Sequence, residues 1–252
     1  MHQNKIVFLA SDCESSRWVY NSLLQDYNIE AAIIEKPVSK KTLIKGRIKR
    51  IGLFKVLGQV FFSAFVVPVL KIKAGKRRAQ LVNQYQLTDT NFIGNKTHYV
   101  ESVNDDACKT LLQQLQPEII IVNGTRIISK KILQSCKAVF INMHVGITPK
   151  YRGSHGGYWA LYNNDAANFG TTIHLVDPGV DTGAVLKQVF TFPDKADNFT
   201  TYPILQAAIG ITALKEVIQQ ALQGDCHTNI YTEKGKLYHQ PTIWEYFFNK
   251  TP

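Results

Sequence analysis

The run EIIIVNG, Glu118–Gly124, is apolar on successive residues and then ends in an Asn and a Gly. A continuous run of Ile and Val is typical of a central parallel strand that is buried on both faces. Strand-like and helix-like segments alternate on its N-terminal side. KIVFLA (Lys5–Ala10) and IEAAIIE (Ile29–Glu35) are extended, whereas SSRWVYNSLLQ (Ser15–Gln25) has helical spacing. This order predicts an α/β fold with a doubly wound, Rossmann-like and mostly parallel sheet.

The same alternation continues toward the C-terminus. We expect a helix that begins at Asn104 or Asp105, strands at AVFINMH, TTIHLVD and AVLKQVFTF, and a long helix over about 200–222. The predicted Rossmann-like domain spans residues 1–225, and a short C-terminal extension follows at 226–252.

Positive charge is concentrated in one segment of the chain. The sequence has 29 Lys and Arg against 19 Asp and Glu, a formal charge of +10. Residues 36–87 hold 13 of the basic residues and no acid, so the rest of the chain carries 16 basic and 19 acidic residues. A nucleic-acid surface needs a basic stripe with base-reading or stacking groups. Here the basic residues flank an apolar centre, and we expect no nucleic-acid partner.

This segment, at about 36–88, is predicted to be a basic and apolar helical insertion. Its apolar centre, residues 56–70, is fifteen residues long and contains Pro68. We expect that length to be too short to span a bilayer. Two interpretations stay open. Residues 40–78 lie on a membrane surface with their basic ends at anionic lipid, or they pack on their own domain or on a second copy in a homodimer.

Cysteine usage and the N-terminus indicate the compartment. Cys13, Cys108, Cys136 and Cys226 are far apart and form no Cys-x-x-Cys pair. Reduced thiols are therefore expected, with neither a disulfide framework nor a structural metal. The N-terminus MHQNKIVFLAS is predicted to be a first strand and not a signal peptide. We expect a cytoplasmic protein, located at the inner membrane surface if the basic segment binds lipid.

Polar residues gather where two predicted strands end. Asn142 and His144 close the strand AVFINMH, and Asp177 and Asp181 lie in the Pro- and Gly-containing turn after TTIHLVD. In open α/β sheets ligands bind at the carboxyl ends of the strands. Asn142, His144 and Asp181 supply an amide donor, a group that titrates near neutrality and a carboxylate. This set suits acyl transfer, in which a donor steadies an oxyanion and an imidazole moves a proton.

Three motifs around these residues resemble the N10-formyltetrahydrofolate-dependent formyltransferases. They are INMH, the loop ITPKYRGSHGGYWAL, and HLVDPGVDTGAVLKQ with its Asp-x-Gly-x-Asp-Thr-Gly turn, and they match that family in order and spacing. The family has glycinamide ribonucleotide, methionyl-tRNA and nucleotide-sugar members. The resemblance is best over about 117–188, whereas residues 36–78 match nothing in the family pattern that we can identify.

The resemblance implies roles for individual residues. Asn142, His144 and Asp181 are the implied catalytic trio, which assists direct attack of an amine on the formyl carbon of N10-formyltetrahydrofolate. The residues implied to hold the folate are Gly124, Thr125, Arg126, Ile127, Ile128, Val176, Asp177 and Val180. Residues expected at the acceptor are Lys150, Tyr151, Arg152 and His155, with a solvated loop as the alternative for Arg152 and His155. No metal is implied.

The expected acceptor is the amine of a nucleotide-linked amino sugar. The loop ASDCESSRW after the first strand lacks the glycines of the ribonucleotide branch, and only about thirty residues follow the long helix, fewer than the RNA-binding barrel of the methionyl-tRNA branch needs. Glycinamide ribonucleotide, methionyl-tRNA and a lipid-linked amino sugar stay open as acceptors. So does a non-catalytic folate- or nucleotide-binding module associated with a membrane. The C-terminal aromatic residues are expected either to stack a base or to pack on the sheet; they are Tyr238, Trp244, Tyr246 and Phe247.

Overall fold

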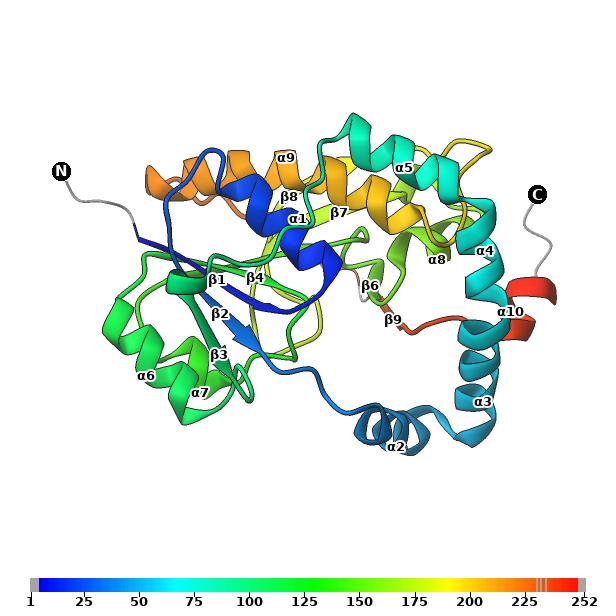
Figure 1. Ribbon diagram of the computed structural model, residues 1–252, viewed down its shortest axis with the longest axis horizontal. Coiled ribbons are helices and arrows are strands. Elements are labelled where there is room, and N and C mark those ends of the chain that lie inside the picture. The colour runs from blue at the N-terminus through cyan, green and yellow to red at the C-terminus, as the bar shows by residue number, and fades with distance from the viewer. Residues whose placement is uncertain (1–4, 230, 232, 234, 249–252) are drawn as a thin grey trace.

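A mixed sheet forms the centre of the molecule (Figure 1). The computed structural model describes residues 5–229, 231, 233 and 235–248. Within them the sheet strands are β1 (Ile6–Ser11), β2 (Ile29–Glu35), β3 (Thr97–Val100), β4 (Ile119–Asn123), β5 (Val139–His144), β7 (Gly170–Leu175) and β8 (Val185–Phe190). Their order is β3-β2-β1-β4-β5-β7-β8. β1 to β5 pair in parallel, and β7 is antiparallel to β5 and β8. The predicted Rossmann-like, mostly parallel sheet is confirmed.

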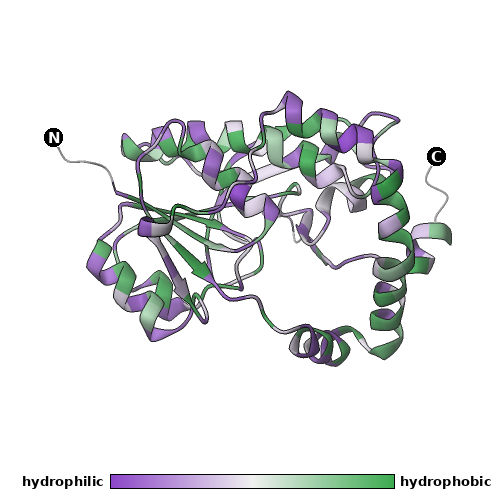
Figure 2. Ribbon diagram, in the orientation of Figure 1, coloured by the Kyte–Doolittle hydropathy of each residue, from purple (hydrophilic) through white to green (hydrophobic). Residues whose placement is uncertain are grey.

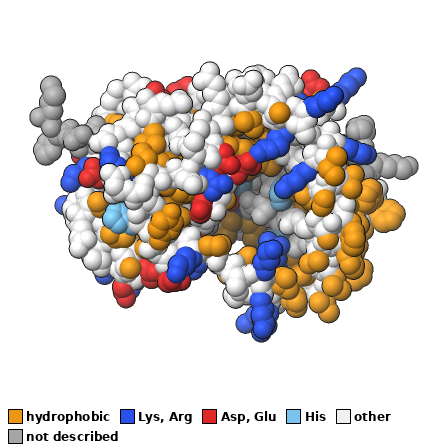
Figure 3. All heavy atoms as spheres, viewed as in Figure 1, with side chains coloured by type: hydrophobic (Ala, Val, Ile, Leu, Met, Phe, Trp, Pro, Cys, Tyr) orange, Lys and Arg blue, Asp and Glu red, His pale blue; other side chains and the backbone are white. Residues whose placement is uncertain are grey.

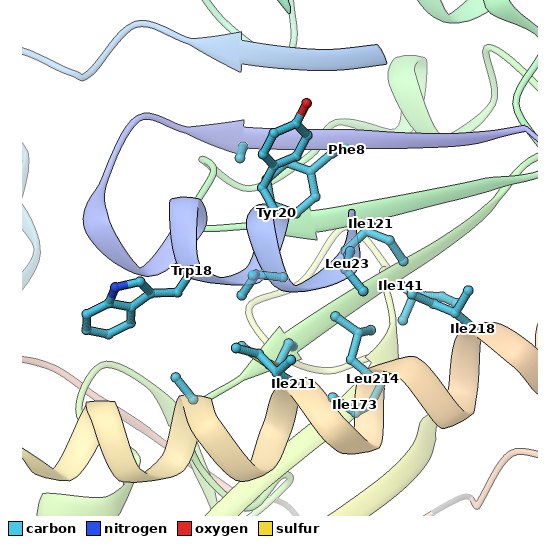
Figure 4. Close-up of a cluster of buried hydrophobic side chains, with 14 of the residues drawn as sticks. Phe8, Trp18, Tyr20, Leu23, Ile121, Ile141, Ile173, Ile211, Leu214 and Ile218 are labelled. Carbon is cyan, nitrogen blue, oxygen red and sulfur yellow. The ribbon is translucent and has the colours of Figure 1, made fainter. Parts of the chain in front are cut away.

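Helices cover both faces of this sheet. The helices on one face are α1 (Glu14–Leu23), α5 (Gly75–Gln84) and α9 (Tyr202–Leu222), and those on the other are α6 (Asp106–Leu115) and α7 (Lys130–Leu133). Successive side chains of a strand point to opposite faces. Phe8 therefore packs in the core beneath α1 and α9, which Figure 4 shows, whereas Leu9 packs in the core beneath α6. Every residue of β4 is buried, as its apolar run predicts.

Local signals in the sequence set the helix ends. The side chain of Asp105 accepts a hydrogen bond from the backbone N–H of Cys108 at 2.8 Å, so α6 begins where an N-capping acid is expected. The remaining helices of the main body are α8 (Gly156–Tyr162) and the single 3-10 turns Gly94–Lys96 and Ala166–Asn168.

The basic segment forms a helical arm, which we define as residues 40–73. Its elements are α2 (Lys40–Ile51), α3 (Leu53–Phe61), a π-helical turn η1 (Phe62–Val66) and α4 (Val67–Lys73). Figure 1 shows the arm beside the sheet domain, and Figure 2 shows that α3 and α4 are largely hydrophobic. We expected the apolar centre to be too short to span a bilayer, but the helix that contains it is longer than those fifteen residues. Helix runs without a break over Leu53–Lys73, and Pro68 lies just after the π-helical turn η1, where the regular α-helical hydrogen-bond pattern is already altered.

This 21-residue helix is the one stretch of the described chain that is long and apolar enough to cross a membrane. The test uses length and composition alone, and core helices of many proteins pass it.

One side of the arm packs on the protein itself. Phe62 and Val66 are buried in a cluster with Tyr151, Trp159 and Phe199. The C-terminal extension joins this cluster, since β9 (Lys236–Tyr238) pairs with β6 (Tyr151–Gly153) and α10 (Ile243–Phe248) lies against α3.

The C-terminal aromatic residues take part in the same packing. Trp244 stacks on Phe54 with ring centroids 4.5 Å apart, and Tyr238 stacks on Trp159 at 5.1 Å. The expectation of packing thus holds for these two rings, although their partners lie in the arm and in α8 and not on the main sheet.

Candidate active site

Two neighbouring strands bring the predicted catalytic residues to one cleft. Asn142 and His144 are two residues apart on β5 and so share a face of the sheet. His174 lies directly opposite Asn142 in the antiparallel register of β5 and β7. Asp181 lies in the turn between β7 and β8. All four side chains line a cleft of about 480 Å³.

Asp181 connects the groups of this cleft. One carboxylate oxygen, Oδ2, lies 3.4 Å from Nδ1 of His144 and accepts a hydrogen bond from the backbone N–H of Gly153 at 2.9 Å. The other, Oδ1, lies 3.6 Å from Nε2 of His174. Burial raises the pKa of Asp181, but His144, His174 and the Gly153 N–H outweigh it and lower the pKa to about 2. Asp181 is therefore a carboxylate at every physiological pH.

His144 has a hydrogen-bond acceptor at each ring nitrogen. Nε2 lies 2.9 Å from the backbone carbonyl of Tyr151, and Nδ1 faces the carboxylate of Asp181. A carbonyl oxygen only accepts, so Nε2 must carry a proton to make this contact. Both ring nitrogens of His144 thus face acceptors of the protein, and Asp181 is placed to orient the ring.

His174 orients the side-chain amide of Asn142. Nδ1 of His174 lies 2.7 Å from the backbone carbonyl of Leu175, and a carbonyl oxygen only accepts, so Nδ1 donates this hydrogen bond. Nδ2 of Asn142 lies 3.0 Å from Nε2 of the same ring. The contact holds the Asn142 side chain against its cross-strand neighbour. From the sequence, His174 is expected to pack or to support the site residues, but its partner Asn142 follows only from the register of β5 and β7.

The walls of the cleft come from two loops at the carboxyl ends of the strands. The loop after β4 and the turn after β7 supply all eight residues expected to hold a folate, namely Gly124, Thr125, Arg126, Ile127, Ile128, Val176, Asp177 and Val180. The side chain of Ile127 is 51% exposed and offers apolar surface to a flat ring. The volume lies within the range of small-molecule sites.

A buried carboxylate, Glu35, holds the first of these loops. Glu35 ends β2, and its Oε1 accepts a hydrogen bond from the backbone N–H of Arg126 at 2.7 Å. Its Oε2 lies 3.1 Å from Nε of the Arg126 guanidinium and accepts from the backbone N–H of Val103 at 3.1 Å. Sequence reasoning missed Glu35, and an acid that ends a strand of otherwise apolar residues was the available signal.

Known proteins share this sequence pattern and this arrangement of strands. The sequence pattern of the Formyl transferase family matches residues 58–201, which include Asn142, His144 and Asp181. The chain belongs to this family. The match begins inside the helical arm, so the expectation that residues 36–78 have no family counterpart was wrong from residue 58 onward.

Individual relatives of this family differ in the acceptor that they are named for. Methionyl-tRNA formyltransferase of Thermodesulfovibrio yellowstonii is 34% identical over 125 residues, which cover 49% of this chain and 40% of that relative. The chain thus matches less than half of that protein's length.

Two solved structures share the fold at low identity. Glycinamide ribonucleotide transformylase 1 of Symbiobacterium toebii has a TM-score of 0.59 at 14% identity, covering 93% of each chain. The N-formyltransferase of Helicobacter canadensis, solved with folinic acid and dTDP-3-aminofucose, has a TM-score of 0.57 at 15% identity, covering 92% of this chain and 70% of that one.

The residues expected at the acceptor lie in several places. Arg152 lines a second hollow, described below, and its Nη2 donates to the carbonyl of Gly235 at 2.8 Å. Lys150 forms an ion pair with Asp165 at 2.6 Å, on an open surface outside the cleft. The ring of Tyr151 is buried, so this residue offers the site its backbone carbonyl.

His155 does not line the cleft, and its ring packs on another aromatic residue. It precedes α8 in a left-handed conformation and packs on Phe199, with ring centroids 4.5 Å apart. Burial, and then the positive charge of Arg47, lower the pKa of His155 to about 4, so it is neutral near physiological pH.

Proposed function

We propose that this member of the Formyl transferase family transfers a formyl group from N10-formyltetrahydrofolate to a primary amine. The observation that carries the proposal is the meeting of Asn142, His144 and the ionised Asp181 along one cleft. Each residue type matches a requirement of formyl transfer, and together they leave no need for a covalent enzyme intermediate.

The proposed chemistry is a direct attack. The amine nitrogen adds to the formyl carbon, and the carbonyl oxygen gains negative charge. Asn142 and protonated His144 stabilise this oxyanion. The tetrahedral carbon then loses its bond to N10, which takes up the proton that the amine gives up, and tetrahydrofolate leaves. Asp181 favours the charged form of His144 and helps it to relay the proton from the amine to N10.

The acceptor is proposed to occupy a second hollow that meets the first at Asp181. This hollow measures about 660 Å³ and includes Arg152, Asp181, Thr182 and Tyr231 in its lining. Asp181 also lines the cleft with His144, so the two hollows share the residue at the reaction centre. The arrangement supports one hollow for the folate and one for the amine.

We propose a nucleotide-linked amino sugar as the amine. Arg152 supplies a cation for a diphosphate, and the ring of Tyr231, 46% exposed, supplies a surface for a base or a sugar. The Helicobacter canadensis relative, solved with an amino sugar nucleotide, supports this choice.

A panel of nucleotide-linked amino sugars, incubated with N10-formyltetrahydrofolate, tests the proposal. We expect tetrahydrofolate release, followed by absorbance, together with a product heavier by one CO unit in the mass spectrum. Glycinamide ribonucleotide and methionyl-tRNA belong in the same panel as competing acceptors. Folate binding without tetrahydrofolate release for any amine would indicate the alternative, a non-catalytic binding module.

A further inference from the structure

The outer side of the helical arm is an apolar face that is largely exposed in the described structure, with Trp244 stacked on Phe54 at one end. Within Leu53–Lys73, exposed apolar side chains recur every three or four residues, and those at least 40% exposed are Leu53, Phe54, Leu57, Val60, Phe61, Phe65, Val69 and Ile72. Phe65 is 64% exposed and Ile72 is 81% exposed. A helix on a water-exposed surface normally carries polar residues on this side.

The exposed face is long and continuous with its neighbours. At the usual helical rise, 21 residues extend about 30 Å. The adjacent α10 adds Phe247, 63% exposed, and Phe248, 85% exposed. Figure 3 shows hydrophobic side chains gathered along the edge of the molecule that α3, α4 and α10 occupy, with Lys and Arg side chains near them. Contiguous apolar surface of this kind marks an interaction site.

The helix next to this face, α2, is basic and is covered by nothing in the described structure. It contains Lys40, Lys41, Lys45, Arg47, Lys49 and Arg50 and no acid, and none of its residues is buried. No described carboxylate forms an ion pair with these side chains.

A helix of this kind needs an external source of stability. An isolated 12-residue helix is marginal in water, and like charges four residues apart, such as Lys41 and Lys45, destabilise it further. The nearby titratable groups do not neutralise it. Burial, and then the positive charges of Arg50, Arg47 and Lys55, lower the pKa of His239.

We propose that the helical arm docks in the plane of an anionic lipid surface. The apolar face of α3 and α4 enters the boundary between headgroups and acyl chains, and the basic residues of α2 meet anionic headgroups. The helix lies on the membrane and does not cross it, because Phe62 and Val66 on its other side are buried in the core of the protein.

Charge favours lipid over a second copy of the chain as the occupant. Residues 36–87 contain 13 basic residues and no acid, and a two-fold interface through this face would bring two such segments together. An anionic bilayer satisfies the apolar face and the basic helix at once. The proposal is independent of the formyl-transfer activity.

Sedimentation of the full chain with vesicles tests the proposal. The vesicles consist of phosphatidylcholine alone or mixed with phosphatidylglycerol, at low and at high salt. We expect pelleting with the anionic vesicles and weaker pelleting at high salt. Lys45→Gln with Lys49→Gln should weaken binding about 30-fold, since each basic residue near an anionic surface contributes about 1 kcal/mol. Phe65→Gln with Ile72→Gln should weaken binding at both salt concentrations.

Control variants use exposed residues of the same kinds on the sheet domain. Lys130→Gln with Lys137→Gln removes two exposed charges, and Ile93→Gln with Tyr99→Gln removes two exposed apolar groups. Both control pairs should bind vesicles as the parent does, and thermal melting checks that every variant is folded. Failure of the folded parent to pellet with anionic vesicles at low salt overturns the proposal. So does a dimer in solution that the Phe65→Gln with Ile72→Gln pair abolishes while vesicle binding is absent.

Discussion

The side-chain nitrogen of Asn142 lies 3.0 Å from Nε2 of His174, its cross-strand neighbour in the register of β5 and β7. His174 in turn donates from Nδ1 to the carbonyl of Leu175, which holds its ring in place beside Asn142. The orientation of the proposed oxyanion donor is therefore set by a neighbouring His that is not itself proposed to move a proton. We call His174 a positioning residue.

His174→Leu should lower kcat for formyl transfer by about tenfold to a hundredfold, the usual range for loss of a group that orients a functional side chain. The KM for the folate should change little, because His174 holds the amide and not the ligand. His174→Gln retains a hydrogen-bonding group at a similar place and should recover most of kcat. Steady-state kinetics of the two variants separate these outcomes. Equal loss in both would show that His174 acts through packing alone.

Asp181→Asn should destabilise the protein in a pH-dependent way. The pKa of Asp181 is lowered to about 2 in the folded protein, so the carboxylate contributes stability above its ordinary pKa and loses that contribution as the pH falls. Wild type should exceed the variant by about 2 kcal/mol in free energy of unfolding at about pH 5, and the difference should shrink below about pH 4.

Urea unfolding at several pH values measures this difference. Asn is a suitable replacement because Asp181 has a φ of 49°, in the left-handed region that Asn tolerates. A difference that is the same at every pH would show that the carboxylate charge is not what stabilises the turn.

Glu35→Gln should weaken folate binding without altering the reacting groups. The carboxylate accepts from the backbone N–H groups of Arg126 and Val103, and the neutral amide is a weaker acceptor whose nitrogen cannot accept at all. We expect a loss of about 1.5–3 kcal/mol in stability, as for a hydrogen bond to a charged group. The Kd for a folate analogue should rise while the kcat of the saturated enzyme is largely retained.

Calorimetric titration measures that Kd, and Glu30→Gln on the same strand is the matched control. Glu30 is only partly buried and lies near the start of β2, at the end of the strand away from Glu35. Unchanged folate affinity in Glu35→Gln would show that the buried carboxylate does not support folate binding through the loop after β4.

Arg152→Met should raise the KM for a nucleotide-linked acceptor and leave the affinity for the folate unchanged. Arg152 lines the second hollow and does not line the cleft of His144. Loss of a charge-assisted contact to a diphosphate is expected to cost about tenfold or more in acceptor KM. Initial rates with each substrate varied in turn give both values. An increase in folate KM alone would assign Arg152 to the other substrate.

Much of the fold could be predicted because its signals are local. The apolar run of β4 and the capping Asp105 depend on neighbouring residues in the chain, and both are where the sequence placed them. Asn142 and His144 could be placed together because residues two apart on a strand share a face.

The features that the sequence did not predict depend on contacts between distant residues. The pairing of Asn142 with His174 requires the register of two antiparallel strands, and the role of Glu35 requires the loop after β4 to fold back over β2. The helical arm was misjudged for a different reason. Proline usually interrupts a helix, but Pro68 lies just after a π-helical turn, and the helix continues past it.

The central claim, that Asn142, His144 and Asp181 carry formyl transfer, is tested most directly by His144→Ala. Two quantities are measured: single-turnover transfer from N10-formyltetrahydrofolate, and folate binding by calorimetry. The acceptor is whichever amine the wild type uses. We predict that transfer falls about a thousandfold or more, through loss of proton transfer and oxyanion support, while the folate Kd stays close to that of the wild type. Transfer at the wild-type rate in the folded variant would contradict the account.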